Sequence, residues 1–200
     1  IFLAASTSLL LVHSSGRAAG SLTIPAAVSL NAGMLQAIGL PADFATVLDR
    51  KLAFRRDAAD DETQKAWLAQ LKSFYGSRSG MPVWVNSQGF NAFSQTAAAE
   101  LSNADDWGLS ASDFPVPTFD TNIKSLENLA DAEIAFSLEV VDYADQARGG
   151  RIDPSSLSLW LDRSPAPTFA TGVMIEVISN SDAGEALRKM HPQSSAFEAL

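Results

Sequence analysis

The chain has 200 residues, of which 46% are hydrophobic and 18% charged. This composition predicts one folded domain with a buried core and excludes a disordered segment. The net charge of −9, without a basic stripe, argues against a nucleic-acid partner, because binding to phosphates depends on Lys and Arg. The absence of cysteine excludes disulfides, thiolate metal sites and a cysteine nucleophile within these residues. With His13 and His191 as the only histidines, we expect no metal and no cofactor.

The first 20 residues have the character of a secretory signal. Residues 1–12 form an uncharged apolar run, and small residues follow up to Gly20. The run is shorter than the roughly 20 residues that a membrane-spanning helix needs. Since the usual basic start is missing and the chain begins with Ile, we interpret residues 1–20 as a signal segment truncated at its start. A buried core helix is the alternative. The signal predicts export to the periplasm, and no later segment is apolar enough for a stable membrane span.

Residues 21–60 are interpreted as an irregular lead-in that contains one short helix. That helix is predicted over residues 43–55, with an apolar face made of Phe44, Val47, Leu48 and Leu52. The acidic run at 57–62 lacks the spacing of a calcium loop, so we expect Asp60 or Asp61 to cap the next helix. The next helix is predicted at 63–75 and ends at the glycine-containing stretch 76–80. Its inward side chains are expected to be Trp67, Leu68, Leu71, Phe74 and Tyr75.

The strongest predicted element is a helix over residues 125–148, which contains neither Pro nor Gly and carries two adjacent apolar stripes. One stripe is Leu129, Phe136, Val140 and Tyr143; the other is Ala130, Ile134, Leu138 and Val141. Gly149 and Gly150 are expected to terminate it in a left-handed conformation. Shorter elements are an extended piece at 81–85, a helix at 91–103, a capping-box turn at 110–113, and helices from 153, at 173–178, at 183–190 and from 194. We therefore predict an all-α fold, an irregular multi-helix bundle around one long central helix, with residues 61–200 as the main domain.

The search for catalytic chemistry finds no nucleophile–base arrangement and no phosphate-binding glycine motif in the required setting. His191 precedes Pro192 at a helix end, where capping or packing is the favoured interpretation. The paired acids Glu127/Asp131 and Glu139/Asp142 lie one turn apart on a single helix, which favours a solvated face over a glycosidase pair. Glu133 lies close to the apolar stripe. If its carboxylate points inward, we expect a partner such as Arg148 or Arg151.

Four blocks of sequence, in order over residues 63–200, resemble the scaffold domain of large bacterial murein L,D-transpeptidases. They are Phe74–Trp84 (F-Y, R-x-G, P-x-W), Ala104–Phe114 (A-x-x-x-G-L-x-x-x-D), Asp142–Pro154 (Y, then G-R-x-x-P) and Leu187–Leu200 (H-P, then L). Phe114 and Phe197 stand where the pattern usually has Tyr, and residues 157–174 do not align. The motif residues, to which we assign structural roles, are Tyr75, Trp84, Gly108, Leu109, Tyr143, Gly150, Arg151, Pro154, His191 and Pro192.

The resemblance implies a non-catalytic scaffold segment of an exported L,D-transpeptidase. In that family a catalytic domain supplies a Cys nucleophile and a His base for 3→3 cross-linking of peptidoglycan, and a peptidoglycan-binding module accompanies it. Because this chain has no cysteine, no catalytic residue can be transferred, and we expect it to be inactive alone. The implied partners are its own missing C-terminal catalytic and peptidoglycan-binding domains, and peptidoglycan.

Two alternatives remain. One is a free-standing periplasmic module that binds peptidoglycan or another protein and has no enzymatic activity. The other is a helical hydrolase, which requires Glu133 and a second acid to converge in one pocket. If the chain is a scaffold segment, we expect an exposed apolar patch or cleft where the missing domain docks.

Overall fold

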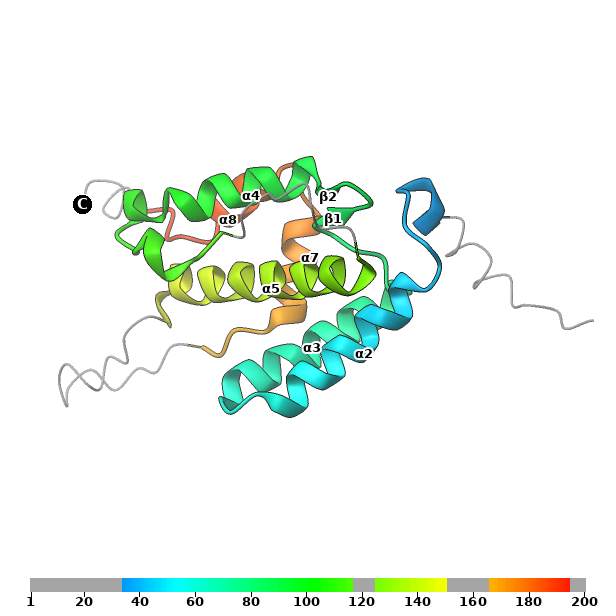
Figure 1. Ribbon diagram of the computed structural model, residues 1–200. Helices are drawn as coiled ribbons and strands as arrows, with labels where there is room; N and C mark the ends of the chain where they lie inside the picture. Colours follow the sequence, from blue (N-terminus) through cyan, green and yellow to red (C-terminus); the bar gives the residue numbers. More distant parts are fainter. Residues whose placement is uncertain (1–33, 117–124, 151–165, 195–200) are drawn as a thin grey trace, which may run out of the picture.

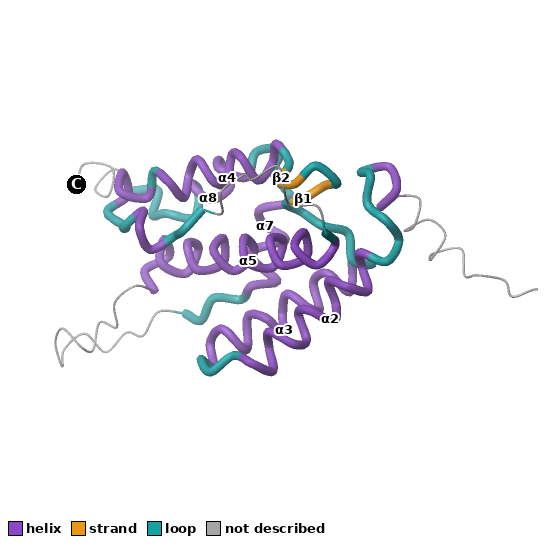
Figure 2. The backbone as a smooth tube through the Cα atoms, viewed as in Figure 1, coloured by secondary structure: helices purple, strands orange, loops and turns teal. Residues whose placement is uncertain are grey.

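A computed structural model describes residues 34–116, 125–150 and 166–194. Most of the described residues lie in helices, and the strands among them form one short hairpin, which confirms the predicted all-α class (Figures 1 and 2). Its α-helices are α2 (Phe44–Ala58), α3 (Glu62–Ser77), α4 (Ala92–Ser102), α5 (Leu126–Asp145), α7 (Ala170–Ile178) and α8 (Ala183–Arg188). Short helical turns are η1 (Ala104–Trp107), η2 (Ala111–Asp113) and η3 (Gln146–Gly150). The strands β1 (Val85–Asn86) and β2 (Gly89–Phe90) pair as an antiparallel hairpin.

Helix α5 is the central helix, as predicted. In Figure 1 it lies between the α2–α3 pair and the α4–α8 pair, and it contacts all four of these helices as well as α7. Both predicted stripes face the core, although Leu138 is only partly buried. The helix also buries two polar side chains, Glu133 and Ser137, which the apolar pattern alone does not predict to lie in the core. These two residues form the centre of a buried polar cluster.

Helices α2 and α3 bury the side chains that their spacing predicts. The buried residues of α2 are Phe44, Val47, Leu48 and Leu52, and those of α3 are Trp67, Leu68, Leu71, Phe74 and Tyr75. The prediction that an aspartate caps α3 is confirmed, because the Asp61 side chain accepts a hydrogen bond from the Gln64 amide at 2.6 Å. Helix α2 belongs to the same apolar core as the helices that follow it, and the domain boundaries proposed from the sequence stay predictions.

Helix α3 ends within the glycine-containing stretch 76–80, as predicted, although two residues beyond Tyr75. Gly76 lies inside the helix, which continues to Ser77. The chain reverses instead at Gly80, whose φ of +74° places it in the left-handed region and whose amide donates to the Tyr75 carbonyl at 2.8 Å. The extended segment expected at 81–85 is reduced to the hairpin strand that begins at Val85.

At the other end of the central helix, the left-handed terminator is confirmed at Gly149, whose φ is +98°. The α-helix ends at Asp145 and is followed by the π-turn η3, which contains that glycine. The capping box at Ser110 is wrong: η2 forms, but the Ser110 hydroxyl bonds to Ser112 rather than to a backbone amide. Over the described ranges, no helix combines the length and apolar character needed to cross a membrane. The signal segment 1–20 and the helices expected from 153 and from 194 lie outside the described residues.

Gly80 and Gly76 form a matched pair for testing the turn after α3. A Cβ added at Gly80 meets the Cβ of Ala45 on α2 at 2.3 Å, and the positive φ adds strain, so we expect Gly80→Ala to lower the free energy of unfolding by about 1–3 kcal/mol. Gly76 is exposed, helical and free of close contacts, so Gly76→Ala should leave stability unchanged or raise it by up to about 1 kcal/mol. Denaturant unfolding measures both. Equal effects of the two substitutions would contradict the close approach of α2 to Gly80.

Candidate functional site: two buried polar clusters on the central helix

The first cluster is centred on the carboxylate of Glu133, which is 0% exposed. Its Oε1 accepts hydrogen bonds from the Tyr75 hydroxyl and the Val83 amide, both at 2.6 Å. Its Oε2 accepts from the amides of Trp84 and Val85, both at 3.0 Å. One side chain of α5 thus bonds α3 and three consecutive amides of the segment leading into the hairpin.

Ser137 extends this cluster by one turn of α5. Its hydroxyl lies 2.8 Å from the Tyr75 hydroxyl and accepts from the Trp84 indole nitrogen at 3.0 Å. The Trp84 ring also stacks on Phe93 of α4 and meets Phe136 edge-on. The motif residues Tyr75 and Trp84, which are nine positions apart in the chain, are therefore brought together on Glu133 and Ser137.

Burial raises the pKa of Glu133 to about 7, while the bonds from Tyr75 and the three amides act in the opposite direction. Burial also raises the pKa of Tyr75 well above its ordinary value, and the charge of Glu133 adds to that rise. Four donors occupy the two oxygens of Glu133, so the arrangement is built for a carboxylate. The prediction that Arg148 pairs with Glu133 is wrong. Arg148 pairs with Glu176 of α7 at 2.6 Å, and backbone amides bond to Glu133 instead. Arg151, the other expected partner, lies outside the described residues.

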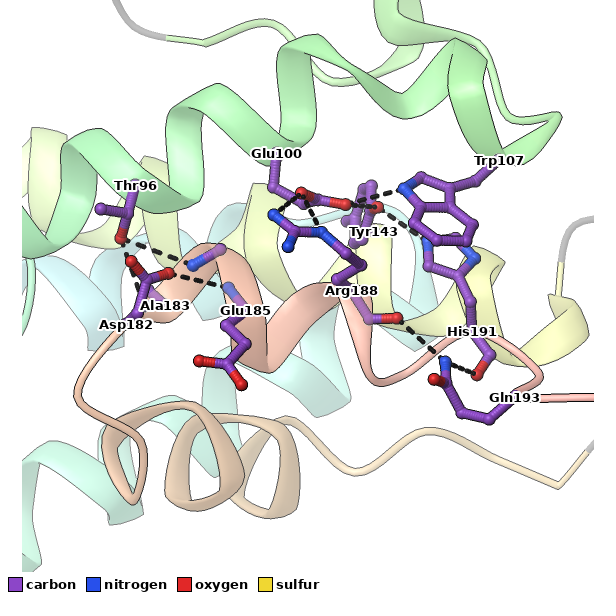
Figure 3. A network of polar contacts seen from close by, with 11 residues as sticks. Thr96, Glu100, Trp107, Tyr143, Asp182, Ala183, Glu185, Arg188, His191 and Gln193 are labelled. Atoms are coloured by element: carbon purple, nitrogen blue, oxygen red, sulfur yellow. Dashed lines mark hydrogen bonds and ion pairs between the residues drawn. The ribbon is translucent and has the colours of Figure 1, made fainter. Parts of the chain in front are cut away.

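The second cluster surrounds Glu100 of α4, which is 3% exposed (Figure 3). Its Oε2 accepts from Nε and Nη2 of Arg188 on α8, at 3.2 and 3.0 Å. Its Oε1 accepts from the Trp107 indole at 2.8 Å and from the Tyr143 hydroxyl at 3.3 Å. The carboxylate therefore links α4 to α8, to η1 and to the end of α5.

His191 completes this second cluster. Its ring stacks on Trp107, with centroids 4.7 Å apart, and its Nε2 lies 2.7 Å from the Tyr143 hydroxyl. Tyr143 has a single hydroxyl proton, which the bond to Glu100 uses. Both contacts of Tyr143 can therefore exist together only if Nε2 of His191 carries a proton and donates to Tyr143. Burial lowers the pKa of His191, and the charge of Glu100 opposes this. The side chain packs in the core, in agreement with the sequence interpretation.

Helices α4 and α8 meet closely beside this cluster, as Figure 3 shows. The Thr96 hydroxyl of α4 accepts from the amides of Ala183 and Gly184 at 3.2 and 3.4 Å. A Cβ at Gly184 would lie 2.6 Å from the Thr96 carbonyl oxygen, so only glycine permits this approach. Asp182 caps α8 by accepting from the Glu185 amide at 2.8 Å. The approach holds Arg188 within reach of Glu100.

The other motif residues have more local positions. Gly108 ends η1 with a φ of +72°, and Leu109 packs against the core, with its amide bonded to the Ala104 carbonyl. Pro192 is exposed. Gly150 closes η3. Arg151 and Pro154 lie outside the described residues. The structural roles assigned to the motif residues stay predictions.

The paired acids on α5 occupy the partly exposed surface of the bundle. Glu127 faces Arg50 at 3.7 Å, and Asp131 bonds both Lys51 and Arg55 of α2. Glu139 and Asp142 are partly buried rather than fully solvated. Burial raises the pKa of Glu139 to about 7, with the charge of Asp142 adding to the rise, and burial also raises the pKa of Asp142. Because Glu133 is enclosed and its oxygens are bonded, the carboxylate pair of a hydrolase does not form around it.

Sequence reasoning missed Glu100, Trp107 and Arg188 as members of a shared cluster. A signal for Glu100 existed, because it stands one helical turn after the apolar Ala97 and directly before the apolar Leu101 in the predicted helix 91–103. Across the described residues no three His, Asp or Glu side chains are arranged to hold a metal ion. What the two clusters can do is hold helices in fixed relative positions.

We expect Glu133→Gln to lower the free energy of unfolding by about 3 kcal/mol, because the amide group presents a donor to amides that need an acceptor. Glu139→Gln is the matched control on the same helix. The pKa of Glu139 is raised, so its favourable contribution is lost as pH rises through about 7, and its replacement should stabilise the protein slightly above that pH. Urea unfolding of both variants measures this. A loss for Glu139→Gln as large as that for Glu133→Gln would refute the special role of Glu133.

His191 predicts a pH dependence of stability. Because burial lowers its pKa in the folded state, the unfolded chain takes up a proton first as pH falls below about 6.5, and stability declines from there until the folded pKa is reached. The groups facing His191 are Tyr143 of α5, Glu100 of α4 and, through Glu100, Arg188 of α8. His191→Gln removes this component, so the stability difference between wild type and variant should shrink between about pH 8 and about pH 5. A difference that is constant or grows over this range would contradict a buried neutral imidazole.

Comparison with known proteins gives one family match. The model of a protein family described as Scaffold domain matches residues 69–200, which is more than half of the chain and contains every motif residue named above. No curated protein and no solved structure matches the chain. On the strength of the family match, the chain belongs to the Scaffold domain family.

Proposed function

We propose that this chain is the non-catalytic scaffold segment of an exported L,D-transpeptidase that forms 3→3 cross-links in peptidoglycan. The family match and the ordered motif blocks support the scaffold part of this proposal. The resemblance of those blocks to murein L,D-transpeptidases supports the enzyme class, the periplasmic location and the role in wall remodelling.

The observation that carries the proposal is the placement of four motif residues. Tyr75 and Trp84 are bonded to Glu133 and Ser137, and Tyr143 and His191 are bonded to each other beside Glu100. All four side chains are at most 3% exposed. Residues that are buried and bonded between helices serve to fix geometry and do not touch a substrate. A family pattern built from such residues favours a positioning role.

The lack of a thiol agrees with this role. An acyl-enzyme formed on cysteine requires a thiolate, and none of the 200 residues supplies one. In this proposal, the helices hold a catalytic module and a peptidoglycan-binding module, encoded elsewhere in the same gene, over the wall strand. The alternative of a free-standing binding module predicts that the gene encodes no such catalytic module.

The proposal is tested with purified gene products and isolated peptidoglycan. We expect a product that includes a downstream cysteine-containing module to form 3→3 cross-links, detected by mass spectrometry of the digested wall. We expect the 200-residue chain alone to form none. The matched control is the longer product with that cysteine replaced by alanine. Cross-links made by the 200-residue chain alone, or a gene without a catalytic module, would overturn the assignment.

A further inference from the structure

Among the basic side chains in the described ranges, Arg78 is the one without a carboxylate partner. The other described arginines and lysines all form ion pairs, namely Arg50, Lys51, Arg55, Arg56, Lys65, Lys72, Arg148, Arg188 and Lys189. An unpaired guanidinium is unusual in a chain with a net charge of −9, where acidic groups outnumber basic ones.

Arg78 follows the last residue of α3, where its charge complements the negative end of the helix dipole. The guanidinium carbon lies over the Phe74 ring, 5.3 Å from its centre, in a cation–π contact. These two contacts explain why a cation is tolerated here. Neither contact is a hydrogen bond. The Nε atom is buried without a partner and closed to solvent, so the two Nη atoms, which bond to no described residue, are the donors that a ligand can reach. A guanidinium held in place with an unused donor is preorganised for a planar anion.

Arg78 lines a shallow cavity of about 260 Å³ that lies between the end of α3, the start of α4 and the α7–α8 connection. Its apolar walls are Pro82, Val83, Phe93 and Ile178, and its polar residues besides Arg78 are Asn180 and Ser181. The Asn180 amide nitrogen donates one of its two hydrogens to the Glu176 carbonyl at 2.8 Å, which leaves Oδ1 as an acceptor and the second N–H as a donor. The cavity therefore combines a guanidinium that can donate to a carboxylate, an amide oxygen that can accept, and a small apolar surface.

We propose that this cavity binds a carboxylate-bearing peptide, with the carboxylate on Arg78, a peptide N–H on Asn180 and a small apolar side chain against Phe93 and Ile178. A guanidinium fork matches a carboxylate in two parallel hydrogen bonds. The identification of this peptide rests on the proposed function, under which it is a stem peptide of peptidoglycan. The scaffold then contacts its substrate directly instead of only holding other domains.

The test is a titration of the full 200-residue chain with a synthetic stem tetrapeptide that has free carboxylates, followed by calorimetry or amide chemical shifts. The paired probe is the same peptide with every carboxylate amidated. We expect Arg78→Gln, and separately amidation, to weaken binding by about tenfold or more, as loss of a charge-assisted hydrogen bond does. The matched control is Arg50→Gln, which removes an equal charge from an exposed position on α2 and should leave binding unchanged.

Arg78→Lys keeps the positive charge near Phe74 and loses the planar fork, so it should bind less tightly than wild type even though it folds. Thermal unfolding of each variant checks the fold. The site is refuted if the free acid does not bind, if the amidated peptide binds equally well, or if Arg78→Gln and Arg78→Lys both bind as tightly as wild type. Failure here leaves cross-linking by the longer gene product untouched. Arg78-dependent binding of the peptide without any cross-linking by that product would instead contradict the transpeptidase assignment and support the binding site.

Discussion

The fold depends on one buried carboxylate. Glu133 is 0% exposed on the central helix and takes donors from Tyr75 of α3 and from three consecutive amides, those of Val83, Trp84 and Val85. A charge is costly in the core unless hydrogen bonds replace the water it loses, and four donors do so here. The constraint is mutual, because the segment before the hairpin forms only a two-residue strand and depends on Glu133 for three of its amide bonds.

The second cluster is also built on a buried carboxylate, Glu100 of α4, and meets the central helix at Tyr143, ten residues after Glu133. Glu100 joins Arg188, Trp107 and Tyr143, and His191 closes the set by stacking on Trp107. Apolar packing alone permits helices to slide and rotate, whereas directional hydrogen bonds between named atoms fix their register. The two clusters bond the neighbouring helices to α5 at separate points, which agrees with the proposed scaffold role. Arg78, by contrast, is held in place by Phe74 and yet has donors to spare, so it is the feature of the described surface that suggests a ligand.

The helices could be predicted because burial follows a helical period: the inward faces of α2 and α3 are those that the spacing of apolar residues gives. The bonds of Tyr75 and Trp84 to Glu133 and Ser137, and the Tyr143–His191 contact, were not predictable from periodicity, since each joins residues of α5 to elements distant in the chain. The Glu133 partner was mispredicted because a sequence displays charged side chains and hides backbone amides, which are equally good donors. Ser110 was misjudged for a related reason, because a capping pattern does not reveal whether a neighbouring hydroxyl such as Ser112 competes for the side chain.

The central claim is that Glu133 locks the 83–85 segment to α5, and native-state hydrogen exchange of the amides tests it most directly. If the claim holds, the amides of Val83, Trp84 and Val85 exchange only when the whole protein unfolds, as slowly as the core of α5, although they belong to no extended sheet. The Gln88 amide, which bonds to an exposed side chain in the same hairpin, should exchange much faster. Exchange of the three amides at the rate of Gln88 would show that the carboxylate does not hold this segment, and the account would fail.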